Sequence, residues 1–214
     1  MEKVFHTADG KQVLMRMVKA IQEHKEYLGK VDGLIGDGDH GMNMNKGFSM
    51  FQERYEGADL DFCDGLRSLG LVLLDEIGGS MGPIYGTVFL SMAKKTEGKN
   101  ILTVSDLADM MTTALYELQE LVAARVGDKT LMDAFMPAVE AVQDAEAQGE
   151  DMYTALEMMK QSARAGRDAT KDMVARYGRS SRLGERSRGV LDAGAVSCCL
   201  LLESMGDGIM EAMR

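Results

Sequence analysis

Apolar residues recur three and four positions apart along almost the whole chain, a spacing typical of amphipathic helices. Val13, Met17, Ile21 and Leu28 form the first such series and predict a helix over about residues 8–28. Similar series predict further helices around 44–51, over 61–77, from Pro83 onward, over 107–122, around 132–139, over 151–177 and over 196–213. No segment alternates in the manner of a strand, so the pattern predicts about eight helices and an all-α fold.

Residues at the expected helix ends support these assignments. Asp61 is suited to cap the third helix, and Thr103 with Asp106 resembles a capping box. Pro83 stands where a first-turn proline is tolerated, whereas Pro137 lies inside a helical pattern and predicts a kink. We expect one domain over residues 1–214.

The amino-acid composition argues against several classes of protein. The chain has 214 residues and a net charge of −10, which argues against general binding to nucleic acids or anionic membranes. The 19 methionines mostly fall at helical spacing and are expected in the core. Cys63, Cys198 and Cys199 form no disulfide framework, no signal peptide is visible, and no apolar stretch approaches a membrane span. A reduced, cytoplasmic protein is the expectation.

An acidic, glycine-rich loop follows the first helix. Asp32, Asp37 and Asp39 fall within eight residues, and glycines at 36, 38 and 41 allow tight turns between them. Carboxylates that converge in this way suit Mg²⁺ shared with phosphate oxygens. An exposed polar turn has the same composition, and the spacing alone leaves both readings open.

Three known motifs do not fit this chain. Gly36, Gly38 and Gly41 match the spacing of a dinucleotide fingerprint, but a helix precedes them and the intervening positions are acidic. An EF-hand loop counted from Asp37 would have Phe48 in place of its final glutamate. A Walker A lysine loop is absent from the sequence.

Two further loops could bind an anion. Residues 78–83 join two helices with three glycines and a serine, so they could expose backbone amides at a helix start or form a plain helix corner. Between residues 179 and 188, four arginines meet one glutamate, which gives a locally basic loop in an acidic protein. Arginine suits bidentate phosphate binding, although this segment taken alone is more typical of a solvated, salt-bridged loop. Carboxylates, a glycine-rich helix start and arginines together would hold magnesium and a polyphosphate, provided that they converge.

Several segments resemble one family. Residues 35–41 with 43–48, residues 127–130, residues 178–187 and residues 192–195 are similar to motifs of the DhaL family, the ADP-binding L subunits of phosphoenolpyruvate-dependent dihydroxyacetone kinases. These motifs occur in order over nearly the whole chain.

The resemblance implies an antiparallel eight-helix barrel that binds ADP or ATP at one end. It implies that Asp32, Asp37 and Asp39 hold two Mg²⁺ ions. The residues implied to line the nucleotide are His40, Gly41, Met42, Asn43, Ser80, Met81, Leu131, Arg179, Asp192, Ala193 and Gly194. No catalytic acid or base is implied, and His40 is expected to contact nucleotide rather than transfer a proton. Met81 and Ala193 depart from the family, which often has serine and proline there.

The resemblance also implies partner subunits. A K-type subunit would hold dihydroxyacetone or a related short ketose, and an M-type subunit with a phosphohistidine would rephosphorylate the bound ADP. This chain would pass the phosphoryl group between them. Two alternatives remain open on the sequence: a kinase subunit that exchanges free ATP without this relay, and a regulatory module that contacts a transcription factor.

Overall fold

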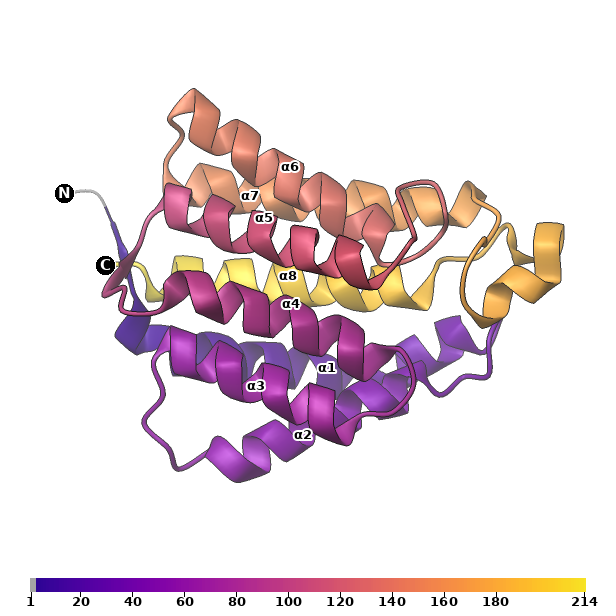
Figure 1. The fold of residues 1–214 in the computed structure, drawn as a ribbon, viewed down its shortest axis with the longest axis horizontal. Coiled ribbons are helices and arrows are strands. Elements are labelled where there is room, and N and C mark those ends of the chain that lie inside the picture. The colour runs from indigo at the N-terminus through magenta and orange to yellow at the C-terminus, as the bar shows by residue number, and fades with distance from the viewer. Residues whose placement is uncertain (1–2) are drawn as a thin grey trace.

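The computed structural model describes residues 3–214, and this part of the chain is mostly α-helical. Eight α-helices and two very short strands are present within it (Figure 1). In chain order the elements are β1 (Phe5–His6), α1 (Gly10–Asp32), α2 (His40–Tyr55), α3 (Phe62–Glu76), α4 (Met81–Thr96), β2 (Ile101–Leu102), α5 (Val104–Leu121), α6 (Met132–Gln148), α7 (Met152–Ala169) and α8 (Ala193–Ala212). Short 3₁₀ helices cover Thr7–Asp9, Thr170–Asp172 and Arg179–Ser187.

The helices run up and down and close into a ring. Each helix packs against the next one along the chain, and α8 packs back against α1. Both chain ends and the β1–β2 pair lie at one end of this barrel, and the α1–α2, α3–α4, α5–α6 and α7–α8 connections lie at the other (Figure 1). The all-α fold predicted from the pattern and the eight-helix barrel implied by the resemblance are therefore confirmed, and four connections that are distant in sequence share one end.

The predicted caps are present. The Thr103 hydroxyl accepts from the Asp106 amide at 3.2 Å while the Asp106 carboxylate accepts from the Thr103 amide at 2.9 Å, which completes the capping box. The Asp61 carboxylate accepts from the Asp64 amide at 2.8 Å at the start of α3. Local side-chain chemistry thus fixes where these helices begin.

The core fills the barrel with aliphatic side chains, methionines and a few aromatic rings. Phe5 packs edge-on against Phe62, and Phe48 packs edge-on against Phe89. α8 is long and apolar enough to cross a membrane by length and composition alone, but it is largely buried among the other helices. Its composition is that of a core helix.

Some boundaries differ from the predicted ones. α1 continues to Asp32 rather than ending near residue 28, because Val31 extends the buried face one turn beyond Leu28. α7 ends at Ala169 rather than at residue 177, because the chain beyond it forms hydrogen bonds to distant loops. α8 starts three residues earlier than predicted, at Ala193. The two strands have two residues each, too few to show alternation in the sequence.

Pro137 does not interrupt its helix. α6 runs continuously from Met132 to Gln148, and the carbonyl of Asp133, four residues before the proline, is left without a helical partner. That carbonyl lies against Gly166 of α7, where an added Cβ would come within 1.8 Å of the oxygen. The helix therefore continues through Pro137, and the Asp133 carbonyl faces α7 at a point of close packing.

Candidate functional site

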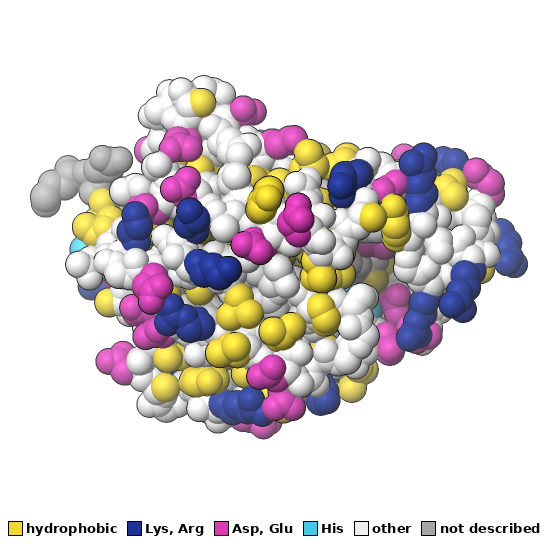
Figure 2. Space-filling view, in the orientation of Figure 1, with side chains coloured by type: hydrophobic (Ala, Val, Ile, Leu, Met, Phe, Trp, Pro, Cys, Tyr) yellow, Lys and Arg dark blue, Asp and Glu magenta, His cyan; other side chains and the backbone are white. Residues whose placement is uncertain are grey.

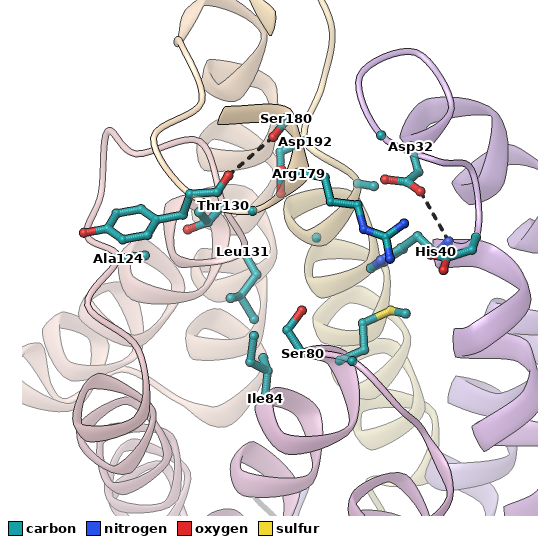
Figure 3. Close-up of a pocket in the computed structure, with 18 of the residues that line it drawn as sticks. Asp32, His40, Ser80, Ile84, Ala124, Thr130, Leu131, Arg179, Ser180 and Asp192 are labelled. Atoms are coloured by element: carbon teal, nitrogen blue, oxygen red, sulfur yellow. Dashed lines mark hydrogen bonds between the residues drawn. The ribbon is translucent and has the colours of Figure 1, made fainter. Parts of the chain in front are cut away.

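A cavity of about 600 Å³ opens at the loop end of the barrel. All four connections at that end contribute to its wall, and Figure 3 shows their side chains around it. The α7–α8 connection, residues 170–191, is called here the arginine loop. Figure 2 shows it as a lobe rich in Lys and Arg side chains beside a hollow, with acidic side chains at the lower edge of the lobe.

The acidic side of the cavity comes from the α1–α2 connection. Asp32 is the last residue of α1, and Asp37 and Asp39 follow in the turn before α2. One carboxylate oxygen from each lies within 4.8 Å of the others. Gly36 allows this approach, because an added Cβ would come within 2.4 Å of an Asp32 oxygen, and Gly38 adopts φ +78°. Three partly exposed carboxylates that converge in this way form a hard-oxygen donor set of the kind that Mg²⁺ prefers.

A helix start faces the cavity from the α3–α4 connection. Ser80 and Met81 open α4, and the Ser80 side chain makes no capping hydrogen bond to the helix amides. Gly82 packs so tightly that an added Cβ would lie 2.1 Å from the Ile77 carbonyl oxygen. The first amides of α4 are therefore available to an anion, with the positive end of the helix dipole behind them.

The arginine loop brings a cation to the carboxylates. Gly178 has φ +70°, and Arg179 follows it and forms an ion pair with Asp37. Both side chains remain substantially exposed, at 63% and 40%. Figure 3 shows the Arg179 guanidinium in the cavity between Ser80 and the acidic turn, the position of a group that could meet phosphate.

Three hydrogen-bonded side chains, those of His40, Ser197 and Tyr85, lie next to the acidic turn. His40 Nε2 lies 2.8 Å from Ser197 Oγ, and the Tyr85 hydroxyl lies 2.6 Å from the same oxygen. Ser197 also donates to the Gly194 carbonyl at 3.1 Å. Burial lowers the pKa of His40 to about 4, although the charge of Asp32 opposes the shift. His40 is therefore a neutral hydrogen-bonding group near neutral pH.

The start of α8 supplies a second carboxylate region. Asp192 caps α8 by accepting from the Ala195 amide at 2.8 Å. Burial raises the pKa of Asp192 to about 7, while that amide and the charge of Lys129 act in the opposite direction. The surroundings of Asp192 therefore differ from those of the three partly exposed carboxylates of the α1–α2 turn.

The α5–α6 connection, residues 122–131, completes the wall with Leu131. Asp133 holds this loop from below, because its carboxylate accepts from the amides of Gly127 at 2.6 Å and Thr130 at 2.7 Å. These two hydrogen bonds tie the loop backbone to the start of α6.

The structure brings most of the residues proposed from the sequence onto this one cavity. The wall includes Asp32, Asp37, Asp39, His40, Asn43, Ser80, Met81, Leu131, Arg179, Asp192, Ala193 and Gly194. Gly41 and Met42 do not line it. Gly41 faces α1, where an added Cβ would lie 1.9 Å from the Lys25 carbonyl oxygen, and Met42 is 62% exposed on α2.

Sequence reasoning missed several wall residues: Ile35, Ile84, Tyr85, Val122, Ala123, Ala124, Lys129, Thr130, Tyr177 and Ser180. For Lys129 and Thr130 a signal existed, since they belong to the 127–130 motif that carried the family resemblance. Ile35 likewise lies in the 35–41 segment that carried the resemblance, whereas the other apolar members carry no such signal, because their spacing is the same as that of core residues.

A second group of potential metal ligands lies at the start of α3 and has a simpler explanation. Asp61, Cys63 and Asp64 have ligand atoms within 4.8 Å of one another. Asp61 caps the helix, Asp64 pairs with Arg67, and the Cys63 thiol donates to the Ala93 carbonyl. Burial also raises the pKa of that thiol, which disfavours the thiolate that would bind a metal.

Comparisons with known proteins agree with this geometry. The sequence matches the DAK2 domain family over residues 34–207. It is 36% identical over 193 residues to the Escherichia coli (strain K12) protein named PEP-dependent dihydroxyacetone kinase, ADP-binding subunit DhaL, covering 90% of this chain and 92% of that one. It is 32% identical over 215 residues to the corresponding subunit of kinase 2 of Listeria innocua serovar 6a, covering 99% of both.

A solved structure shares the fold. The dihydroxyacetone kinase of C. freundii, in complex with AMP-PNP and Mg²⁺, superimposes with a TM-score of 0.68 at 20% identity. The alignment covers 97% of this chain and 35% of that kinase, so this chain spans about a third of the larger protein.

Proposed function

The chain belongs to the DAK2 domain family, and from this premise we propose that it is the nucleotide-binding phosphoryl-transfer subunit of a dihydroxyacetone kinase. As such it would bind ADP or ATP with magnesium in the cavity at the loop end of the barrel. The enzyme class is a phosphotransferase that acts only together with partner subunits. We also propose that residues 1–214 form one domain, which functions in the cytoplasm.

One observation carries this proposal: the acidic turn, the start of α4 and Arg179 converge on a single cavity. Taken separately, each loop has an ordinary explanation as a polar turn, a helix corner or a solvated loop. Together they supply a cation site, free helix amides and a guanidinium within the same space. Those groups are complementary to a metal-bound diphosphate.

The donor set fits magnesium. Asp32, Asp37 and Asp39 would hold the metal, with two ions as the proposed number. Bound Mg²⁺ would neutralise negative charge on phosphate oxygens. The chain itself would position the nucleotide through the Ser80 and Met81 amides and Arg179, and His40 would remain neutral beside the acidic turn. Met81 lacks the hydroxyl of the serine that the family often has at this position, but its backbone amide is still present at the start of α4.

The proposed division of labour places substrate and donor on other chains. A K-type subunit would hold dihydroxyacetone or a related ketose, and an M-type subunit would supply phosphate from a phosphohistidine. The relatives that share nearly the whole length of this chain are named as ADP-binding subunits, which supports a nucleotide held as a cofactor. Positioning and charge stabilisation are then the contributions of this chain to the reaction.

The test is whether nucleotide stays bound. The protein should be purified in magnesium, denatured with acid, and the released nucleotide quantified by chromatography. Near-stoichiometric ADP that exchanges slowly with added labelled ATP is the result expected for the relay. Rapid exchange would instead favour a subunit that uses free ATP, and absence of any binding to Mg·ADP or Mg·ATP would contradict the proposed function.

A further inference from the structure

Lys129 is a fully buried lysine that the proposed nucleotide chemistry does not use. It lies in the α5–α6 connection with φ +61°, and it is the only residue other than glycine with positive φ among residues 3–214. Such a backbone conformation is uncommon for a residue with a side chain. Burying an ammonium group is also costly unless its hydrogens are accepted by nearby oxygens. Both features require a specific explanation.

The Lys129 side chain joins the two ends of the arginine loop. Its Nζ donates to the Thr170 carbonyl at 2.6 Å and also to the Val190 carbonyl. Thr170 directly follows α7, and Val190 lies three residues before α8. One ammonium group therefore bridges the entry and the exit of the loop that carries Arg179.

Two further hydrogen bonds join the ends of the arginine loop to each other. The Gly189 amide donates to the Lys171 carbonyl at 2.7 Å, and the Asp192 amide donates to Thr170 Oγ1 at 3.0 Å. These bonds link the two ends to each other, whereas Lys129 links both to the rest of the barrel. Burial lowers the pKa of Lys129, and the neighbouring Asp192 charge counteracts this.

Lys129 is itself held in place. Asp133 fixes the amides on either side of it, at Gly127 and Thr130. Asp128 accepts from the Arg125 amide at 2.8 Å, and its own carbonyl accepts from the Arg176 amide at 3.1 Å. The lysine therefore projects from a rigid loop, which makes it suited to setting the position of a neighbouring segment.

We propose that Lys129 is a positioning residue that fixes both ends of the arginine loop and thereby directs Arg179 into the cavity. The functional meaning of that positioning rests on the proposed nucleotide site, whereas the anchoring of the loop does not. K129M keeps a long apolar side chain but leaves the Thr170 and Val190 carbonyls without their donor, so the lost hydrogen bonds are those to the two ends of the loop. K129M should therefore loosen the loop selectively.

The first test measures amide hydrogen exchange of the full chain without nucleotide. In K129M, the amides of Ala175, Arg176 and Gly189 should exchange about 10-fold faster or more than in wild type, as expected when a hydrogen-bonded anchor is lost. K160M is the matched control, because Lys160 is also buried but pairs with Glu157 and Asp207 on α7 and α8. It should leave those amides unchanged, and K129R should restore slow exchange.

Two results would overturn the anchoring: unchanged exchange in K129M, or equal acceleration in K160M. If K129M does not fold, K129R decides, because it keeps charged donors toward both carbonyls. Failure of both variants to fold would show that Lys129 serves the whole barrel rather than the loop, and would also overturn the proposal.

The second test is a double-mutant cycle on Mg·ADP affinity. R179A should weaken binding about 10- to 100-fold in wild type but less than about threefold in K129M, because a loosened loop no longer presents the arginine. Equal effects of R179A in both backgrounds would overturn the positioning role. If wild type itself fails to bind Mg·ADP, the proposed function fails, while the exchange measurement still decides whether Lys129 anchors the loop.

Discussion

At the residue scale, the ion pair between Arg179 and Asp37 connects two halves of the cavity that are 142 positions apart in the sequence. Each side chain has two possible partners: its present counterion, and a metal or phosphate group when a ligand is bound. Both are substantially exposed, so their mutual attraction is weakened by water and contributes little to folding. Substitutions at these positions should therefore change ligand binding far more than stability.

Asp37→Ala should abolish the magnesium-dependent part of ADP binding, since one of three convergent carboxylates is lost. Folding should survive, because removing a carboxylate relieves repulsion within the metal-free cluster. Calorimetric titration with Mg·ADP measures the effect, and Asp64→Ala is the control because Asp64 lies at the start of α3, outside the cavity. Wild-type affinity in the Asp37 variant would show that this carboxylate does not bind the metal.

Arg179→Lys should not behave as a conservative change. If the guanidinium donates to phosphate through paired N–H groups, an ammonium cannot reproduce that planar arrangement. Loss of a charge-assisted hydrogen bond costs about 1.5–3 kcal/mol, which corresponds to roughly one to two decades in affinity for Mg·ADP. Dissociation constants should be compared at matched salt and magnesium. Equal values would mean that Arg179 is a surface residue paired only with Asp37.

At the element scale, close packing between helices determines where the acidic turn lies. α2 begins directly after Asp39, and its second residue, Gly41, packs onto the backbone of α1. An added Cβ at Gly41 would lie 1.9 Å from the Lys25 carbonyl oxygen and 2.7 Å from the Gly29 amide nitrogen. The nucleotide contact that the resemblance implies for Gly41 stays a prediction, and the structure adds a packing role for this glycine directly after Asp39 and His40.

Gly41→Ala should therefore destabilise the protein by about 1–3 kcal/mol or more, because backbone atoms must move apart. The same change at Gly57 is the control, since that glycine is exposed and an added Cβ meets nothing within 4 Å. Denaturant unfolding of the two variants and wild type makes the comparison. Similar midpoints for all three proteins would show that α2 can shift away from α1 without cost.

The elements were largely predictable from the sequence, for reasons that are local. The capping box at Thr103 and the cap at Asp61 depend on residues three positions apart, so the sequence shows them directly. The end of α7 was missed because it depends on distant partners, such as the Asp128 carbonyl that accepts from Arg176. The link from Lys129 to the arginine loop was missed for the same reason, because its acceptors lie 41 and 61 residues away.

At the scale of the whole molecule, the up-and-down topology places every second connection at one end of the barrel (Figure 1). The carboxylates, the helix start and the arginine loop come from three of these four connections. The sequence showed the separate motifs, but it did not show their convergence, since periodicity indicates which face of a helix is buried and not which loops meet. That convergence was anticipated only through the resemblance to a family.

We expect the isolated chain to be catalytically silent toward dihydroxyacetone with phosphoenolpyruvate. In the proposed division of labour, both the ketose site and the phosphohistidine belong to partner subunits. Consumption of phosphoenolpyruvate should be followed with the purified chain alone, and then after adding K-type and M-type subunits from a related system. Turnover by the chain alone, free of contaminating subunits, would contradict this division.

The central claim is that the acidic turn, the start of α4 and Arg179 form one metal-dependent nucleotide site. A crystal structure of the chain with ADP and Mn²⁺ tests it most directly, because manganese replaces magnesium at hard-oxygen sites and gives an anomalous signal. The account predicts anomalous peaks beside Asp32, Asp37 and Asp39, with the diphosphate between them, the first amides of α4 and the Arg179 guanidinium. Manganese bound away from these carboxylates, or a nucleotide bound outside the cavity, would contradict it.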